Sequence, residues 1–130
     1  MLYGEGVALE LGIKGEASMV VRADQTAVAV GTGDAEVLST SSLLEVMQQA
    51  TMDALAGNLP DGAITAGLRV NLDHLRGTTV GSEVKATATL VRIEGRRLIF
   101  EAEAHSDGQL CGTARIIRVR IEKERFLAGL

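Results

Sequence analysis

One amphipathic helix is predicted in this chain, and most of the remaining sequence alternates with the period of a strand. The helix covers residues 41–56, and its apolar positions recur at helical spacing: Leu43, Met47, Ala50 and Ala54. Hydroxyl side chains at 39–42 can cap its start, and Gly57 and Pro60 end it. A lone helix has to bury its apolar face against other elements, so a covering sheet is required.

The remaining segments predict that sheet, and its strands are antiparallel. Strands are expected at residues 15–22, 63–73, 83–93, 97–105 and 109–122. Short turn signals at Glu94–Gly95 and Asp107–Gly108 join the last three strands into a meander. In the last strand the apolar phase slips at Ile116–Ile117, which indicates a bulge or burial on both faces. Residues 36–39 form a short extended lead-in to the helix.

Length and composition indicate one globular domain. The chain has 130 residues, of which 46% are hydrophobic and 23% charged. We therefore expect a single domain over residues 1–130 with an α+β fold. One long central helix is wrapped by an antiparallel sheet of about five strands. A core this poor in aromatic side chains gains from oligomerisation, since Val, Leu, Ile and Ala each bury less area.

Charge and residue usage exclude several classes of partner. The net charge is −4, from 13 Lys and Arg against 17 Asp and Glu, which argues against nucleic-acid binding. The aromatic residues are Tyr3, Phe100 and Phe126, too few for base stacking. No apolar run approaches the ~20 residues of a membrane span. Residues 1–10 do not resemble a signal peptide, and Cys111 is the single cysteine, so we expect a cytoplasmic protein.

His74 closes the longest alternating apolar run in the chain. That run consists of Ile64, Ala66, Leu68, Val70 and Leu72, and His74 continues its phase. On a regular strand the imidazole therefore points where the apolar side chains point, beside a turn at 75–81. An imidazole in such a place can act as a base or a hydrogen-bond donor near neutral pH. The alternative interpretation is a structural histidine on an apolar face.

Three stretches, in this order and spacing, resemble one known family. They are residues 31–55, which lead into the helix, residues 67–81, which include His74, and residues 94–100 together with Gly112–Thr113. The chain resembles the hotdog-fold thioesterases, and more narrowly the fluoroacetyl-CoA thioesterase-like group. The likeness runs from about residue 12 to residue 126, nearly the whole chain.

The resemblance implies a function and a set of site residues. Members of the family hydrolyse acyl-CoA thioesters, with coenzyme A as part of the substrate and no separate cofactor. They work as homodimers or homotetramers with each site at a subunit interface. Transferred position by position, the catalytic residues are Thr40, Gln48 and His74, and Gly67 lines the substrate site.

Gln48 is the departure from the family pattern, which has a glutamate at this position. An amide is neither a carboxylate nucleophile nor a general base, although it can hydrogen-bond a thioester oxygen or hold a water. Three hypotheses follow. The first is an acyl-CoA thioesterase, and the second is a hotdog protein that binds acyl-CoA or a related ligand without turnover. The third is a hotdog dehydratase or hydratase, which has only one obvious acid–base group here.

Other residues have both a functional and a structural interpretation. Thr40 is either a substrate-aligning hydroxyl or a plain helix cap, and Gly67 allows either a ligand or the helix to approach closely. Arg76 and Arg97 are expected to contact the phosphates of CoA, although surface arginines are often only solvated. Cys111 is expected to be a buried, inert thiol. No group of His, Asp and Glu has the spacing of metal ligands.

Overall fold

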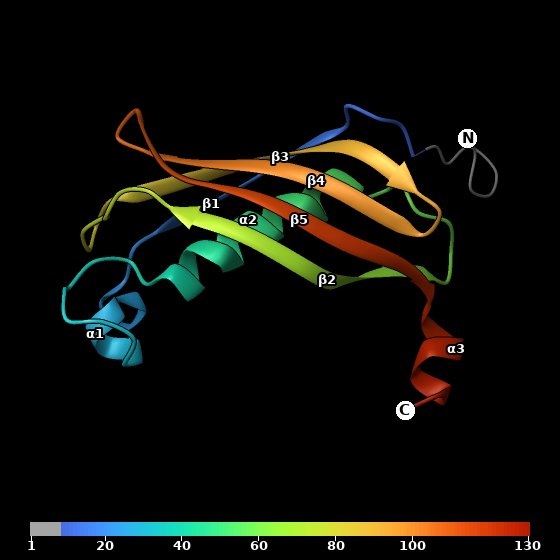
Figure 1. The fold of residues 1–130 in the computed structure, drawn as a ribbon, viewed down its shortest axis with the longest axis horizontal. Coiled ribbons are helices and arrows are strands. Elements are labelled where there is room, and N and C mark those ends of the chain that lie inside the picture. The colour runs from blue at the N-terminus through green and yellow to red at the C-terminus, as the bar shows by residue number, and fades with distance from the viewer. Residues whose placement is uncertain (1–8) are drawn as a thin grey trace.

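The computed structural model describes residues 9–130 (Figure 1). The first strand and two short helices precede the long helix: β1 (Lys14–Val20), the 3-10 helix η1 (Ala23–Gln25), α1 (Ala27–Val30) and α2 (Thr40–Leu55). The rest of the chain forms four strands and a last helix: β2 (Ala63–His74), β3 (Glu83–Glu94), β4 (Arg97–Ser106), β5 (Gln109–Glu122) and α3 (Lys123–Ala128).

The strands form one five-stranded sheet in the order β1-β3-β4-β5-β2, and every neighbouring pair is antiparallel. The sheet curls over α2, which packs along its concave face, while α1 and α3 lie at the two ends (Figure 1). This is the predicted α+β hotdog arrangement, with one long helix wrapped by an antiparallel sheet. Strands β1 and β2 are its edges, and β2 pairs on one side only, with β5.

Helix α2 begins and ends where its capping residues require. The Ser39 hydroxyl accepts a hydrogen bond from the Ser42 N–H at 3.2 Å, so Ser39 is the N-cap and Thr40 is the first helical residue. After the helix, Gly57 adopts a φ of +75°, a conformation that glycine reaches without strain. The face toward the sheet is apolar, and Leu43 and Met47 are completely buried in it.

Gly15 lets α2 approach β1 closely. A Cβ atom added at Gly15 would lie 2.2 Å from the Ala50 carbonyl oxygen and 2.2 Å from the Ala54 nitrogen. Only hydrogen atoms on Gly15 and methyl groups on the two alanines allow the backbones to pack at this distance. The Asp53 carboxylate adds a polar contact, since it accepts a hydrogen bond from the Glu16 N–H at 2.8 Å.

The central strands follow the predicted pattern. Their inward positions are buried: Val84, Ala86, Ala88 and Leu90 on β3, and Leu98, Phe100, Ala102 and Ala104 on β4. The turn between β4 and β5 has a φ of 53° at Asp107 and 73° at Gly108, as expected for the Asp-Gly hairpin signal. Alternation with period two therefore identifies the sheet face that covers α2.

Strand β2 contains a bulge that the sequence did not reveal. Gly67 pairs with Arg118 and Arg69 pairs with Ile117, so Leu68 is an extra residue in the ladder. The bulge changes which residues face the helix. Thr65 and Gly67 face it before Leu68, and His74 shares that side after it. The prediction that Ile64, Ala66 and Leu68 share the face of His74 was wrong, and the Leu68 side chain is 49% exposed.

Of the two predicted causes of the slip in apolar phase at Ile116–Ile117, burial on both faces is confirmed and a bulge in β5 is wrong. Strand β5 keeps its register with β4 there, and the irregularity is the extra residue on β2 directly opposite. Ile116 is fully buried on the helix side, and Ile117 is half-buried on the other face. His105, the last residue of the strand predicted at 97–105, lies in β4 and is exposed.

Three short elements were not predicted: η1 and α1 in a region of ambiguous sequence, and α3 at the end of the last strand. Within residues 9–130, no helix combines the length and the apolar character needed to cross a bilayer. The expectation about a signal peptide falls almost entirely on residues 1–8, and it lies, like Tyr3, outside the described residues.

The packing at Gly15 gives a test of this fold. The substitution Gly15→Ala forces a Cβ atom into the backbone of α2, so we expect it to lower the free energy of unfolding by about 3 kcal/mol. Gly129→Ala is the matched control, because its Cβ would meet the Phe126 and Arg125 carbonyl oxygens at ordinary distances of 3.6 and 3.7 Å. Urea unfolding at one protein concentration measures both changes, and equal stability of the two variants would contradict the packing described.

Candidate active site

Thr40 and His74 form a hydrogen-bonded pair at one end of the molecule. The Thr40 Oγ1 atom lies 2.8 Å from the His74 Nδ1 atom, although the residues come from the start of α2 and the end of β2. Since Ser39 caps the helix, the Thr40 hydroxyl is free to bond the imidazole. The interpretation of Thr40 as a plain helix cap was therefore wrong.

Local packing explains why these two residues meet. Leu38, just before the helix, donates its N–H to the Thr78 carbonyl oxygen at 2.8 Å, in the loop that follows β2. Gly112 pairs with His74 across β2 and β5, and a Cβ there would lie 2.9 Å from Leu43 Cδ2. The first turn of α2 thus packs directly against the end of β2.

The second ring nitrogen of His74 has no partner. The Nε2 atom is buried, and no hydrogen bond reaches it from residues 9–130. A buried polar atom without a partner is rare in folded proteins and points to a functional role or to a group that binds there. With Nδ1 engaged by Thr40, the Nε2 atom remains available for a proton transfer.

A pocket of about 350 Å³ opens beside this pair. It is lined by α1, the lead-in segment, the start of α2 and the end of β2: Ala27, Thr32, Val37, Leu38, Thr40, Ser41 and His74. The first N–H groups of an α-helix have no partner within the helix, and they carry its positive dipole end. The pocket therefore combines an imidazole, a hydroxyl and a helix N-terminus, which suits a developing oxyanion.

Gln48 lies in a second cluster, around a buried arginine of β5. Arg118 donates from Nη1 to Gln48 Oε1 at 3.0 Å and from Nε to Thr65 Oγ1 at 2.8 Å. Its Nη2 atom donates to the Thr65 carbonyl oxygen at 3.3 Å. Arg118 is only 7% exposed, and burial lowers the pKa of its guanidinium from the ordinary value. An arginine nevertheless keeps its charge in proteins.

The exposed backbone of Gly67 lies directly over this second cluster, and we call this position the Gly67 window. The glycine is exposed, and a Cβ atom there would lie 3.1 Å from Gln48 Oε1 and 3.8 Å from Arg118 Nη1. Because Gly67 has no side chain, the amide and the guanidinium are covered by backbone alone at this point. Gly67 thus lies against the Gln48 side chain of α2, which fits the interpretation that the glycine lets the helix approach closely.

The structure does not bring the two clusters together within one chain. Thr40 and Gln48 are separated by about 12 Å along the axis of α2, at ~1.5 Å per residue. His74 and Gly67 are about 20 Å apart along β2, at ~3.3 Å per residue. Both clusters nevertheless lie on the helix side of β2, whose other edge is unpaired in the sheet.

The two predicted CoA-binding arginines lie in different places. Arg76 follows His74 by two residues, is exposed, and donates its backbone N–H to the Cys111 carbonyl oxygen. Arg97 is exposed at the start of β4, where it pairs with Val119, at the far end of the sheet from the His74 pocket. Arg76 is therefore close to His74 in sequence, but it lines a separate hollow with Ser82 and Ser106.

Arg118 is a candidate site residue that the sequence did not indicate. It continues the inward phase of Ala114 and Ile116 on β5, and a charged residue in that phase is what made the apolar pattern slip. The slip was interpreted as a bulge or as burial on both faces, and neither interpretation pointed to a buried arginine in a core-facing position.

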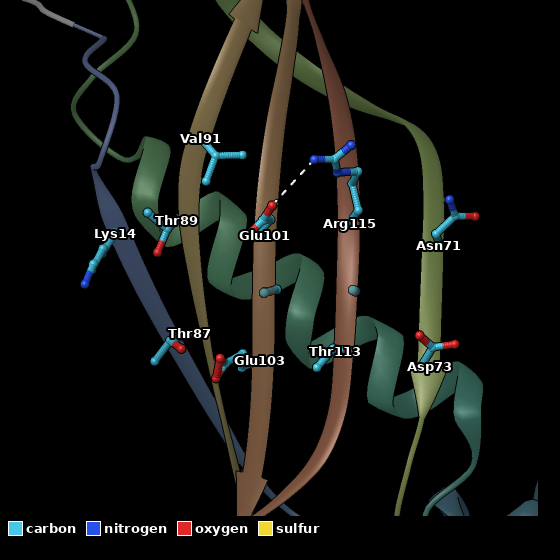
Figure 2. A pocket seen from close by; sticks show the side chains of 12 residues that line it. Lys14, Asn71, Asp73, Thr87, Thr89, Val91, Glu101, Glu103, Thr113 and Arg115 are labelled. Carbon is cyan, nitrogen blue, oxygen red and sulfur yellow. Dashed lines mark hydrogen bonds and ion pairs between the residues drawn. The ribbon is translucent and has the colours of Figure 1, made fainter.

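The outer face of the sheet has a different character (Figure 2). A hollow of about 730 Å³ lies there, with threonines and charged side chains such as Asp73, Glu101, Glu103 and Arg115. Asp73 points away from α2 in this view, so it does not orient the neighbouring His74. Arg115 and Glu101 form an ion pair at 3.5 Å on this face.

Two further expectations concern thiol and metal chemistry. Cys111 is 1% exposed, and its Sγ atom donates to the Ala104 carbonyl oxygen at 3.3 Å. Burial raises the pKa of the thiol, which disfavours the nucleophilic thiolate, as predicted for a core cysteine. In the part of the chain that the structure describes, no three His, Cys, Asp or Glu residues are placed to hold a metal ion.

Comparisons with known proteins identify the family of this chain. Residues 21–124 match the fluoroacetyl-CoA-specific thioesterase family. The fluoroacetyl-CoA thioesterase of Streptantibioticus cattleyicolor is 32% identical over 93 residues, which cover 72% of this chain and 67% of that protein.

Solved structures give the same result. The fluoroacetyl-CoA thioesterase FlK superposes with a TM-score of 0.85 at 26% identity, over 94% of this chain and 95% of that one. A variant of that enzyme in complex with fluoroacetate and CoA has a TM-score of 0.81 at 27% identity, covering 91% and 99% of the two chains. A hot-dog-like protein from Thermanaerovibrio acidaminovorans shares the fold, with a TM-score of 0.84, 24% identity and coverage of 92% and 89%. The present chain thus belongs to the fluoroacetyl-CoA-specific thioesterase family.

Proposed function

We propose that this protein hydrolyses a small acyl-CoA thioester at a site shared by two copies of the chain. The observation that carries the proposal is the Thr40–His74 pair, with a buried and unpartnered Nε2 atom beside a helix N-terminus. Membership of a thioesterase family supports the reaction type, and the relative in complex with fluoroacetate and CoA supports the class of substrate.

The hydrogen bond at Nδ1 decides what His74 can do. If Nδ1–H donates to the Thr40 oxygen, the Nε2 atom keeps a free lone pair and is a general base. Nε2 takes a proton from water, the water oxygen attacks the thioester carbon, and the C–S bond breaks. The proton passes to the leaving sulfur, and the products are a carboxylic acid and free CoA. The N–H groups at the start of α2 stabilise the charge on the thioester oxygen.

In this proposal the remaining candidate residues bind the substrate and take no part in proton transfer. Gln48 is not a base, and we assign it to the acyl group together with the window at Gly67. Arg76 lies where a CoA phosphate could reach it when the thioester is at His74. Arg97 stays a predicted phosphate contact, and in this proposal a second copy of the chain would have to bring it near.

A homodimer formed through β2 would unite the two clusters. Antiparallel pairing of β2 with its copy, about a two-fold axis near Asn71, sets His74 of one chain opposite the Gly67–Leu68 bulge of the other. Exposed apolar side chains flank this edge, since Leu68, Met52 and Leu75 are 49%, 50% and 56% exposed. A homotetramer would then use the outer sheet face. The cytoplasmic location stays a prediction from the single, buried cysteine.

The two histidines of the chain give a matched test of the catalytic group. We expect His74→Ala to lower kcat/KM for short acyl-CoA thioesters by about a hundredfold or more, since it removes the general base. His105→Ala changes an exposed histidine on β4 and is expected to leave the rate unchanged. Release of the CoA thiol from a panel of short and aromatic acyl-CoAs is the measurement. Equal rates for both variants would exclude His74 from the chemistry.

Mixing two inactive variants tests the shared site. A His74→Ala chain and a Gln48→Leu chain are unfolded together and refolded, so that mixed dimers form. Each mixed dimer then contains one site with both natural residues, and about a quarter of the natural activity returns. If the site were built within one chain, the mixture would stay as inactive as its parts. An active Gln48→Leu chain on its own would show that the amide is dispensable.

The second candidate function is binding without turnover, and Gln48 is the observation that favours it. A protein of this kind would show micromolar CoA or acyl-CoA binding by calorimetry and no release of CoA thiol. Gln48→Glu distinguishes the two cases, because it restores the carboxylate of the family pattern. If the natural chain is inactive and this variant hydrolyses acyl-CoA, the protein is a binding module on an enzyme scaffold.

A further inference from the structure

Arg118 carries a buried positive charge that no carboxylate of residues 9–130 balances. Its three hydrogen-bond acceptors are an amide oxygen, a hydroxyl and a backbone carbonyl, all of them neutral. None of the ion pairs among residues 9–130 includes Arg118. A buried ion without a counter-ion is costly, and proteins ordinarily pair it. The buried guanidinium of Arg118 therefore has no counter-ion among the described residues.

The orientation of the Gln48 amide adds donors to this cation. A guanidinium only donates, so the atom of Gln48 that faces Arg118 has to be the oxygen Oε1. The amide NH₂ group then points away from Arg118 and is left to donate elsewhere. The guanidinium also has more N–H groups than the three that its recorded bonds use.

The acceptors of the cluster are already engaged. Thr65 Oγ1 accepts from Arg118 and lies 4.0 Å from Met52 Sδ, to which its hydroxyl donates. Gln48 Oε1 accepts from Arg118. The polar atoms nearest the window at Gly67 are Gln48 Oε1, which already accepts from Arg118, and Arg118 Nη1. The cluster as a whole keeps unused N–H donors on the guanidinium and the amide, with one net positive charge. A group that satisfies such a cluster has several acceptor atoms and a negative charge, and a carboxylate has both.

We propose that the Gln48–Arg118 cluster binds a second carboxylate on the substrate, so that the protein acts on short acyl-CoA thioesters with an acid-terminated acyl group. This inference rests on the proposed function and names its class of substrate. The β2 pairing proposed above would bring His74 and Thr40 of a second copy to the cluster, and neither is an anion. Asp73, the carboxylate next to His74 in the sequence, faces the outer side of the sheet.

The proposed anion site gives a reason for Gln48, where the family pattern has a glutamate. A glutamate at position 48 would lie on the guanidinium and neutralise it, and the site would then suit an uncharged acyl group. With Gln48 the hydrogen bond is retained while the charge is left for the ligand. The same change that removes a base therefore creates an anion site.

Binding of two thioesters of equal shape tests the proposal. Malonyl-CoA and isovaleryl-CoA have the same acyl length and differ by a carboxylate in place of an isopropyl group. The His74→Ala variant is expected not to hydrolyse either thioester, so calorimetry can measure the binding of both. We expect it to bind malonyl-CoA at least about tenfold more tightly than isovaleryl-CoA. Initial rates on the natural protein check the same preference in kcat/KM. Equal binding, or tighter binding of isovaleryl-CoA, would overturn the inference.

Two variants that each add one negative charge test whether Arg118 is the group that binds the second carboxylate. Gln48→Glu places a carboxylate on Arg118 and is expected to reduce the preference for malonyl-CoA by about tenfold or more. Gln49→Glu makes the same change of charge on an exposed neighbouring residue and should leave the preference intact. Identical preferences in the two variants would show that Arg118 does not bind the second carboxylate.

The outcomes separate this inference from the proposed function. Tight malonyl-CoA binding without release of CoA thiol would refute the thioesterase and keep the anion site. Hydrolysis of both thioesters without preference would keep the thioesterase and refute the anion site.

Discussion

The close packing of α2 into the curl of the sheet is the constraint on which the other features depend. At Gly15 the helix lies so near β1 that even one carbon atom would meet the backbone of Ala50 and Ala54. This contact and the one at Gly112 hold the helix at two points along its length. Since a helix is rigid, they also determine where Thr40 and Gln48 lie, one at the end of β2 and the other over Arg118.

The bulge at Leu68 is the second requirement of the site. Gly67 and His74 are an odd number of positions apart, so on a regular strand their side chains would point to opposite faces. One extra residue in the ladder reverses that parity, and both residues face the helix. Without the bulge, a dimer formed through β2 could not place an imidazole and the Gly67 window on the same side of the joined sheet.

The sequence predicts what depends on periodicity and capping, and it misses what depends on pairing between strands. Helix α2 and the inward faces of β3 and β4 follow from apolar spacing, because each side chain there reports its own burial. The bulge is invisible in that pattern, because alternation across Leu68 continues in the residue types although not in the backbone. The same limit concealed Arg118, since a single charge in an apolar phase resembles a break in the strand.

The chemistry of the site follows from which atoms can donate and which can accept. An arginine beside a glutamate forms a neutral pair, and the same arginine beside a glutamine keeps its charge, although the hydrogen bond has the same geometry. A change of one functional group can therefore alter substrate charge preference without moving the backbone. If His74 and Thr40 of a second copy supply the reaction, Gln48 is free to serve in recognition. Loss of the family carboxylate then changes what the site selects, and it does not by itself remove the means of hydrolysis.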